Sequence, residues 1–479
     1  MKYKTYAIVL SVVLLSLCMT VDNQNAKVPL KKPAAAPVKT PSPAPQKNSP
    51  YTPCQGCNVI LITIDALAAG HVGAYGYPRN TTPNIDRISR NGVLFKNAYT
   101  QWPMTSQSLA SMMSGRYPYE IGVMKLRTKV PDKTLMLAEI LKSEGYYTSG
   151  FVGNVNLAKS FEFDQGFDEY HEMWSEFDPK LTKFPISSWY PAGKINEEVM
   201  PWLKGRTGKR FFLWIHYIDP HQPYWPPAPF NNSFVGDKLY GDGKIIPWSK
   251  VLKFYPYLPR GKPVDVSYLI SQYDGEVAYA DSNVGEFLLE IEAQGLLKNS
   301  VVIITADHGE GMDEHDPYFG HGIGLYNSQL KVPLIIYSPG VEPRVVETPV
   351  GLVDVVPTVL GILGKNIASK RLSGRSLIPA MVGQDFSEDV FSESHGLYSV
   401  VEGDFKLIAS KKNKAKTLFN LQSDPAELNP VVDNALTERL SKKIEAYSKK
   451  EKTSKISSQP VKEMDETIKG QLEALGYMN

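Results

Sequence analysis

The sequence predicts an α/β fold with a large, mainly parallel central sheet. Four apolar runs have the composition of strands buried on both faces, at residues 59–64, 211–218, 301–305 and 332–337. Segments with helical spacing lie between them, notably at residues 135–143 and 277–297. Buried strands that alternate with helices are typical of a parallel sheet with helical crossovers.

The pattern changes after about residue 385. Short alternating pieces at residues 390–393 and 405–408 precede a charged helical tail. We expect a small antiparallel sheet and a C-terminal helix packed on the main domain. The predicted boundaries are therefore residues 54–384 for the main domain and residues 385–479 for a C-terminal subdomain.

The N-terminus has the layout of a secretory signal peptide over residues 1–20. Lys2 and Lys4 supply positive charge, and the apolar run that follows is too short to span a bilayer comfortably. We expect export to the periplasm or the cell surface. Residues 15–18 partly resemble a lipoprotein box, which would lipidate Cys18 and anchor the chain to a membrane. Leu17 is larger than the residue usual before that Cys, so cleavage without lipidation stays the alternative.

Residues 21–53 are rich in Pro, Ala and Lys and lack apolar periodicity, which predicts an extended linker. Directly after it, Cys54 and Cys57 form a C-x-x-C. No second Cys pair completes a zinc site, so a local disulfide is favoured over a redox-active pair. The 52 basic and 50 acidic residues nearly balance, and no nucleic-acid partner is expected.

Polar residues suited to chemistry follow the apolar runs. In an open α/β sheet, ligands collect beyond the carboxyl ends of the strands. Asp65 follows the first run and would, taken alone, equally suit a turn cap. Asp307 and His308 follow the third run and suit a divalent metal. Five of the eight histidines cluster in two such segments: His216, His221, His308, His315 and His321.

Several segments resemble motifs of the sulfatases of the alkaline phosphatase superfamily and occur in that family's order. They are I-D-A-L-A-A-G-H-V-G-A-Y-G-Y (64–77), the window at residues 97–118 that ends in G-R-Y-P, H-Y-I-D-P-H-Q-P-Y (216–224), T-A-D-H-G-E (305–310), G-H-G-I-G-L-Y-N-S-Q-L-K-V-P-L-I-I (320–336) and V-D-V-V-P-T-V-L (353–360). F-N-L-Q-S-D-P-A-E-L-N and the final L-E-A-L-G-Y are similar to its C-terminal signatures. The resemblance implies an alkaline-phosphatase-like sandwich, with helices flanking the central sheet.

The resemblance also implies a site. It places one divalent metal ion on four residues: Asp65, Thr105, Asp307 and His308. It makes His221 and His321 contact the bound oxyanion or the leaving group, and we expect Asp219 and Asn154 to bind substrate. Ala66 stands where sulfatases usually supply a second acid. The smaller ligand set with one imidazole favours Mn or Zn, with Ca or Mg as alternatives.

Two cationic contributions to a sulfate pocket are missing. In the family's Cys-x-Pro-Ser-Arg motif, Gln107 replaces Pro and Leu109 replaces Arg. The Gly-Lys-Trp-His-Leu-Gly segment, which places a Lys and a His on the sulfate in many sulfatases, is G-F-V-G-N-V-N at residues 150–156.

Thr105 falls at the position of the catalytic Cys or Ser. Sulfatases oxidise that residue to formylglycine, whose hydrate attacks with one hydroxyl and expels sulfate with the other. Threonine does not follow that route, so no formylglycine is expected. With one hydroxyl, water or an acceptor must attack the covalent intermediate directly. This resembles the phosphodiesterases and the phosphoglycerol and phosphoethanolamine transferases of the superfamily.

We therefore expect an exported, metal-dependent hydrolase that cleaves phosphate or sulfate esters through a covalent Thr105 intermediate, with phosphoesters favoured. The expected substrate is a small molecule or a glycan or lipid ester. Phosphoglycerol- or phosphoethanolamine-type transfer to an acceptor is one alternative, and a non-catalytic binding protein on the same fold is another.

Overall fold

The computed structural model describes residues 51–174, 191–206, 208–239, 243–251, 261–315, 318–366, 371–454, 459–461 and 464–474. The predicted signal peptide, Cys18 and residues 21–50 of the predicted linker lie outside this description. The chain from Lys47 to Asn479 forms one compact unit. Cys54 and Cys57 form the expected disulfide directly before the first strand. None of the helices in the described ranges is both long and apolar enough to cross a membrane.

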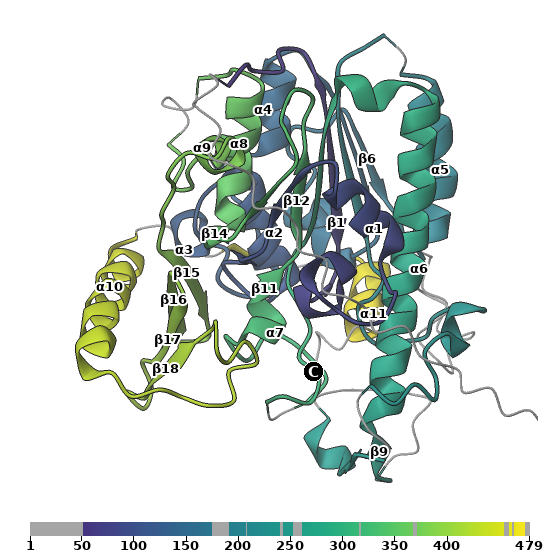
Figure 1. Ribbon diagram of the computed structural model, residues 1–479. Coiled ribbons are helices and arrows are strands. Elements are labelled where there is room, and N and C mark those ends of the chain that lie inside the picture. The colour runs from purple at the N-terminus through teal and green to yellow at the C-terminus, as the bar shows by residue number, and fades with distance from the viewer. Residues whose placement is uncertain are drawn as a thin grey trace, which may run out of the picture. The chain divides into compact units, whose positions relative to one another are not determined.

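An eight-stranded sheet forms the centre of the described chain (Figure 1). Its order is β13 (Arg344–Val346), β2 (Val93–Phe95), β12 (Leu334–Tyr337), β10 (Ser300–Ala306), β1 (Asn58–Ile64), β7 (Phe211–Tyr217), β5 (Tyr147–Val152) and β6 (Glu169–Glu172). Strand β1 is buried along its whole length and pairs in parallel with β10 and β7. The predicted α/β fold with a mainly parallel sheet is confirmed.

One predicted strand is wrong. Residues 332–337 do not form a single strand, because Pro333 lacks the N–H that a ladder needs. Lys331–Val332 (β11) pairs instead with Ala98–Tyr99 (β3) in a separate sheet that also contains β14 (Val350–Gly351). The Pro333 carbonyl accepts a hydrogen bond from Thr305 Oγ1 at 2.7 Å. Strand β12, which follows Pro333, runs antiparallel to both of its neighbours.

Helices cover both faces of the sheet (Figure 1). One group contains α1 (Pro83–Ser89), α5 (Ala192–Lys204) and α6 (Val266–Ala293), and the other α2 (Thr105–Ser114), α4 (Leu137–Ser143) and α8 (Val355–Ile362). Helix α6 begins earlier than the apolar spacing suggests, because the Asp265 side chain accepts a hydrogen bond from the Tyr268 N–H and caps it. Shorter helices are α3 (Pro118–Ile121), α7 (Asn327–Leu330), α9 (Ile378–Met381) and α11 (Glu466–Ala474).

The C-terminal residues form the expected antiparallel sheet and helix. The described strands are β15 (Val390–Ser394), β16 (Leu397–Glu402), β17 (Phe405–Ser410) and β18 (Lys416–Asn420), covered by α10 (Asn434–Thr453) (Figure 1). Two further pairs join β4 (Thr128–Lys129) to β19 (Gln459–Pro460), and β8 (Ile245–Ile246) to β9 (Val264–Asp265). On the face of β16 and β17 that α10 covers, Val400, Leu407 and Tyr447 share a buried apolar cluster.

A buried ion pair joins this C-terminal sheet to α7. Lys406 Nζ lies 2.9 Å from Glu427 Oε1, and both side chains are fully buried. Lys406 Nζ also donates to Asn327 Oδ1 at 3.1 Å, and the Asn327 N–H donates to Glu427. Burial lowers the pKa of Lys406, which Glu427 partly offsets. Helix α7 follows the His321 loop closely, so this pair holds the subdomain beside that loop.

We expect Glu427→Ala to lower the free energy of unfolding by about 3 kcal/mol, because it leaves the Lys406 charge buried without its partner. Urea denaturation followed by circular dichroism measures the change. The double variant Lys406→Met with Glu427→Gln should lose less, since no charge then stays buried. A Glu427→Ala protein as stable as the parent would contradict the role of the pair.

Candidate active site

Polar side chains from neighbouring strands meet at the carboxyl edge of the sheet. Asp65 follows β1, Asp307 follows β10, and Asp219 and Asn154 come shortly after β7 and β5. Because β10, β1, β7 and β5 are adjacent and parallel, their carboxyl ends lie at the same edge. The topology therefore gathers residues that the sequence spreads over more than two hundred positions.

Asp65 is fully buried, and its two oxygens have different surroundings. Oδ2 accepts a hydrogen bond from Asn154 Nδ2 and lies 3.2 Å from His216 Nε2. Oδ1 has no hydrogen-bond partner among the described residues. Burial acts to raise the pKa of Asp65, but the nearby His221, together with His216 and His308, holds it below its usual range.

Asp307 has the same asymmetry. Its Oδ1 accepts hydrogen bonds from the backbone N–H groups of Ala66, at 3.1 Å, and His308, at 2.8 Å. Its Oδ2 is buried, and within the described ranges nothing donates to it. Burial and the neighbouring charge of Asp65 raise the pKa of Asp307 to about 7. Two carboxylates with unpaired buried oxygens therefore adjoin each other.

His308 presents a lone pair to these oxygens. Its Nδ1 lies 2.8 Å from the Gly309 carbonyl, which only accepts, so Nδ1 carries the proton and Nε2 does not in the neutral ring. Nε2 lies 3.4 Å from Asp307 Oδ2 and 3.7 Å from Asp65 Oδ1. Burial lowers the pKa of His308, which favours this neutral ring. Two unpaired carboxylate oxygens and an imidazole lone pair fit a divalent cation.

Thr105 begins helix α2 beside this cluster. Its side chain is buried, and Oγ1 lies 3.4 Å from His308 Nε2. The position at a helix N-terminus favours negative charge on that oxygen. Ser108, one turn later, donates to the Asp307 carbonyl at 2.5 Å and accepts from Thr100 Oγ1 at 2.7 Å. These bonds tie α2 to the end of β10 and so hold Thr105 in place.

His221 and His321 form the opposite rim. Their ring centroids are 5.0 Å apart, and the His321 ring lies 4.2 Å from that of His308. His321 Nδ1 lies 3.0 Å from Glu310 Oε1, and His221 Nδ1 donates to the Gln222 carbonyl at 2.7 Å. Burial raises the pKa of Glu310 to about 7 and lowers that of His221. The predicted catalytic residues thus lie together.

The sequence argument assigned no role to His216 or Glu310. His216 lies inside β7 opposite Thr63 of β1, and Asp65, His216 and Asp307 also have ligand atoms within 4.8 Å of one another. His216 Nδ1 lies 2.8 Å from Thr63 Oγ1. If Thr63 donates this bond, Nε2–H holds Asp65 in place; with the opposite tautomer, Nε2 is a metal ligand. Only the strand pairing reveals this contact.

Asn154 and Asp219 mostly bond within the protein. Asn154 donates to Asp65, and its Oδ1 accepts from the Asn156 N–H at 2.9 Å. Asp219 Oδ2 accepts from the Ala192 N–H at 2.8 Å. Burial raises the pKa of Asp219 to about 6. Their expected substrate contacts stay a prediction, while Asn154 has a visible part in holding Asp65.

The departures from the family pattern have structural consequences. Ala66 has a φ of 56°, its N–H donates to Asp307, and its carbonyl accepts from Tyr273 Oη at 2.7 Å. Its methyl group supplies no ligand. Leu109 is fully buried inside α2 and carries no charge toward the site. The cluster therefore has the anionic groups of a metal site without an Arg at this helical position.

Buried carboxylates, imidazoles and a hydroxyl gathered beyond a parallel sheet have the chemistry of an ester hydrolase. Comparison with known proteins agrees: the sulfatase family profile matches residues 57–365, more than half of the chain, and the protein belongs to the sulfatase family. The family and the relatives described below establish an ester hydrolase, and sulfatases of this family use a divalent metal.

The relatives include Arylsulfatase K of Bos taurus, which is 26% identical over 443 residues, covering 80% of this chain and 81% of the relative. Delta 4,5-hexuronate-2-O-sulfatase of Bacteroides thetaiotaomicron is 23% identical over 422 residues, covering 77% of this chain and 83% of the relative. The solved structure of the phosphonate monoester hydrolase of Agrobacterium radiobacter has a TM-score of 0.67 at 19% identity, covering 82% of this chain and 96% of that one. This last likeness supports the fold.

Two histidine variants separate the two ligand sets. We expect His308→Ala to abolish stoichiometric binding of a divalent metal, because it removes the lone pair between Asp65 and Asp307. His216→Ala should bind the ion about 10–100-fold more weakly, as expected for a group that orients a ligand. Metal titration with elemental analysis measures both. Loss of binding in His216→Ala but not in His308→Ala would make Asp65, His216 and Asp307 the ligands.

Proposed function

We propose that this protein is an exported, metal-dependent hydrolase that cleaves phosphate esters through a covalent intermediate on Thr105. One observation carries the proposal. Thr105 Oγ1 lies 3.4 Å from His308 Nε2, beside the buried, unpaired oxygens of Asp65 and Asp307. A hydroxyl beside such a cluster is placed to act as a nucleophile.

The metal site in this proposal consists of Asp65, Asp307, His308 and Thr105. A bound divalent cation would lower the pKa of the Thr105 hydroxyl and offset charge on a non-bridging phosphoryl oxygen. A single imidazole among oxygen ligands favours Mn or Zn over Ca. His216 would then hold Asp65 from behind, as its 3.2 Å approach to Oδ2 allows.

The residues of the chain divide the remaining work. Thr105 Oγ forms a bond to phosphorus as the bond between phosphorus and the ester oxygen breaks. His221 and His321, on the opposite rim, supply hydrogen bonds or a proton to the departing oxygen and the phosphoryl group. Glu310 holds the His321 ring through Nδ1. Water then attacks phosphorus, releases phosphate and returns the Thr105 hydroxyl.

Phosphate esters are favoured over sulfate esters for two reasons. Thr105 has one hydroxyl, so it cannot expel the bound acid from a hydrate and needs direct attack by water. Two cations of the sulfate pocket are also missing, since Leu109 and Asn154 stand in the corresponding segments. The likeness in fold to a phosphonate monoester hydrolase is consistent with phosphorus chemistry. Sulfate ester hydrolysis, suggested by the names of the sequence relatives, is the second candidate.

The proposed substrate is a small-molecule or glycan ester. One relative is named for a sulfated hexuronate, which supports a sugar-bearing substrate. Residues 1–20 would direct export, and Cys18 would anchor the chain to a membrane if it is lipidated.

We expect Thr105→Ala to lower kcat/KM by about 10³-fold or more, because it removes the group that bonds to phosphorus. Thr105→Ser keeps the hydroxyl and is the matched control, expected to stay within about tenfold of the parent. Assays use 4-nitrophenyl phosphate, bis(4-nitrophenyl) phosphate and 4-nitrophenyl sulfate. Parental activity in Thr105→Ala would sink the nucleophile, and turnover of the sulfate alone would sink the phosphoester preference.

Metal removal should reversibly abolish this activity. Dialysis against a chelator is expected to lower the rate by about 10²-fold or more, because the Thr105 hydroxyl loses its activating charge. Adding back Mn or Zn should restore the rate better than Ca. Full activity of a chain shown by elemental analysis to be metal-free would contradict the proposal.

A further inference from the structure

His395 occupies an unusual position in the turn between β15 and β16. It has a φ of 47° and Gly396 a φ of 81°, so both central residues of a two-residue hairpin turn are left-handed. Gly, Asn and Asp suit the first of these positions, and a bulky side chain there is strained. The imidazole is exposed although its backbone is unfavourable. Strain retained at an exposed polar residue points to a use for its side chain.

The hydrogen bonds of Ser394 define the form of the His395 ring. Ser394 Oγ lies 3.0 Å from the Gly322 carbonyl and 2.8 Å from His395 Nδ1. The carbonyl only accepts, so the single Ser394 proton goes to Gly322. Ser394 Oγ then accepts from His395 Nδ1–H. A neutral His395 ring therefore has its lone pair on Nε2 and recognises a hydrogen-bond donor.

This turn adjoins the active site through two contacts. Gly322, which accepts from Ser394, directly follows His321 in the opposite rim. The His395 ring also packs against Trp102, three residues before Thr105, with centroids 5.8 Å apart. Trp102 Nε1 is buried and has no hydrogen-bond partner among the residues that the structure describes. An acceptor and an unsatisfied donor thus lie together on the His321 side of Thr105.

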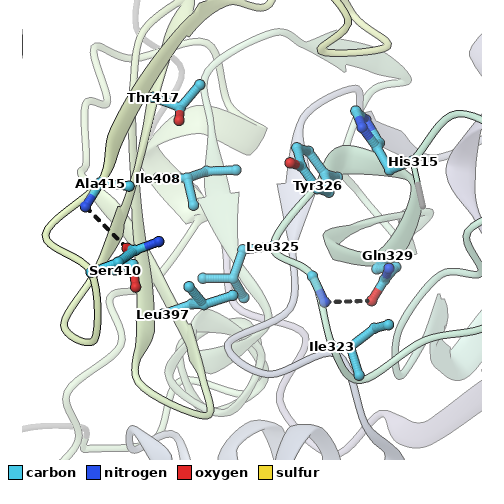
Figure 2. A pocket seen from close by; sticks show the side chains of 12 residues that line it. His315, Ile323, Leu325, Tyr326, Gln329, Leu397, Ile408, Ser410, Ala415 and Thr417 are labelled. Atoms are coloured by element: carbon cyan, nitrogen blue, oxygen red, sulfur yellow. Dashed lines mark hydrogen bonds between the residues drawn. The ribbon is translucent and has the colours of Figure 1, made fainter. Parts of the chain in front are cut away.

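A cleft of about 320 Å³ opens next to these residues, between the chain that follows His321 and the C-terminal sheet (Figure 2). Leu325 and Tyr326 face Leu397 and Ile408 across it (Figure 2). Its polar lining consists of neutral hydroxyl and amide groups together with His315: Gln329, Ser410, Asn413 and Thr417. No Asp, Glu, Lys or Arg lines it within the described ranges. Its size is that of a small-ligand site.

We propose that His395 and this cleft bind the leaving group of the substrate, and that this leaving group is a neutral sugar. The inference rests on the proposed ester hydrolysis at Thr105 and adds the alcohol that is released. A sugar hydroxyl donates to His395 Nε2, and further hydroxyls suit the neutral polar groups of the cleft. A flat aryl alcohol lacks these donors, and a charged headgroup finds no counter-charge on the Asp, Glu, Lys or Arg side chains that the cleft lacks.

The test compares two substrate classes in the full chain. His395→Asn keeps a residue that tolerates positive φ and removes Nε2. The probes are a panel of hexose phosphate and sulfate monoesters at each hydroxyl, beside 4-nitrophenyl phosphate and sulfate. We expect the ratio of kcat/KM for the best sugar ester to that for the aryl ester to fall about tenfold, the effect of one lost hydrogen bond. Lys414→Asn, also exposed and at a φ of 58°, is the matched control and should leave the ratio unchanged.

A second measurement does not depend on turnover. Methyl hexosides should bind Thr105→Ala in calorimetry, and about tenfold more weakly when His395→Asn is added. If aryl esters are cleaved but no sugar ester is turned over and no hexoside binds, the inference falls while the proposed function stands. Equal losses on both substrate classes give His395 a merely structural role and overturn it. If no ester is cleaved, the proposed function falls, and hexoside binding still decides the inference.

Discussion

The structure depends on keeping two buried carboxylates beside each other. Asp65 and Asp307 end adjacent parallel strands, so the sheet forces them together, and burial makes their mutual repulsion costly. The protein offsets this in part: the N–H groups of Ala66 and His308 hold Asp307, and Asn154 and His216 hold Asp65. One oxygen of each stays unpaired among the described residues and faces His308. A cation there completes the balance, which is why these acids indicate a working site.

Other elements are positioned around this pair. Helix α2 is tied to the Asp307 carbonyl through Ser108, which places the Thr105 hydroxyl beside His308. The β10 loop that begins with Asp307 continues to Glu310, which holds His321 on the opposite rim. Through Gly322 and Ser394, that rim contacts the C-terminal sheet. The subdomain predicted at residues 385–479 therefore borders the side of the site from which an alcohol would leave.

Much of the fold followed from local patterns. Runs of β-branched residues marked β1, β7 and β10 closely, because a strand buried on both faces needs apolar side chains at every position. The error at residues 332–337 arose because Pro333 lies between two apolar pieces of similar character that pair in different sheets. The committed site residues lay at strand ends, where the order of strands brings them together. His216 was missed because it lies inside a strand, and His395 because it is far from every motif.

The sequence by itself determined the class of fold and the residue types at the site, because apolar periodicity and short motifs are local properties of the chain. It also showed that Thr105 replaces a Cys or Ser and that Leu109 replaces an Arg. Only the tertiary structure decided which oxygens of Asp65 and Asp307 stay unpaired and which nitrogen of His308 faces them. The same holds for His395, whose place beside the His321 loop depends on contacts between distant segments. Hydrogen bonds across strands and turns set these properties, and their partners lie up to 241 positions apart.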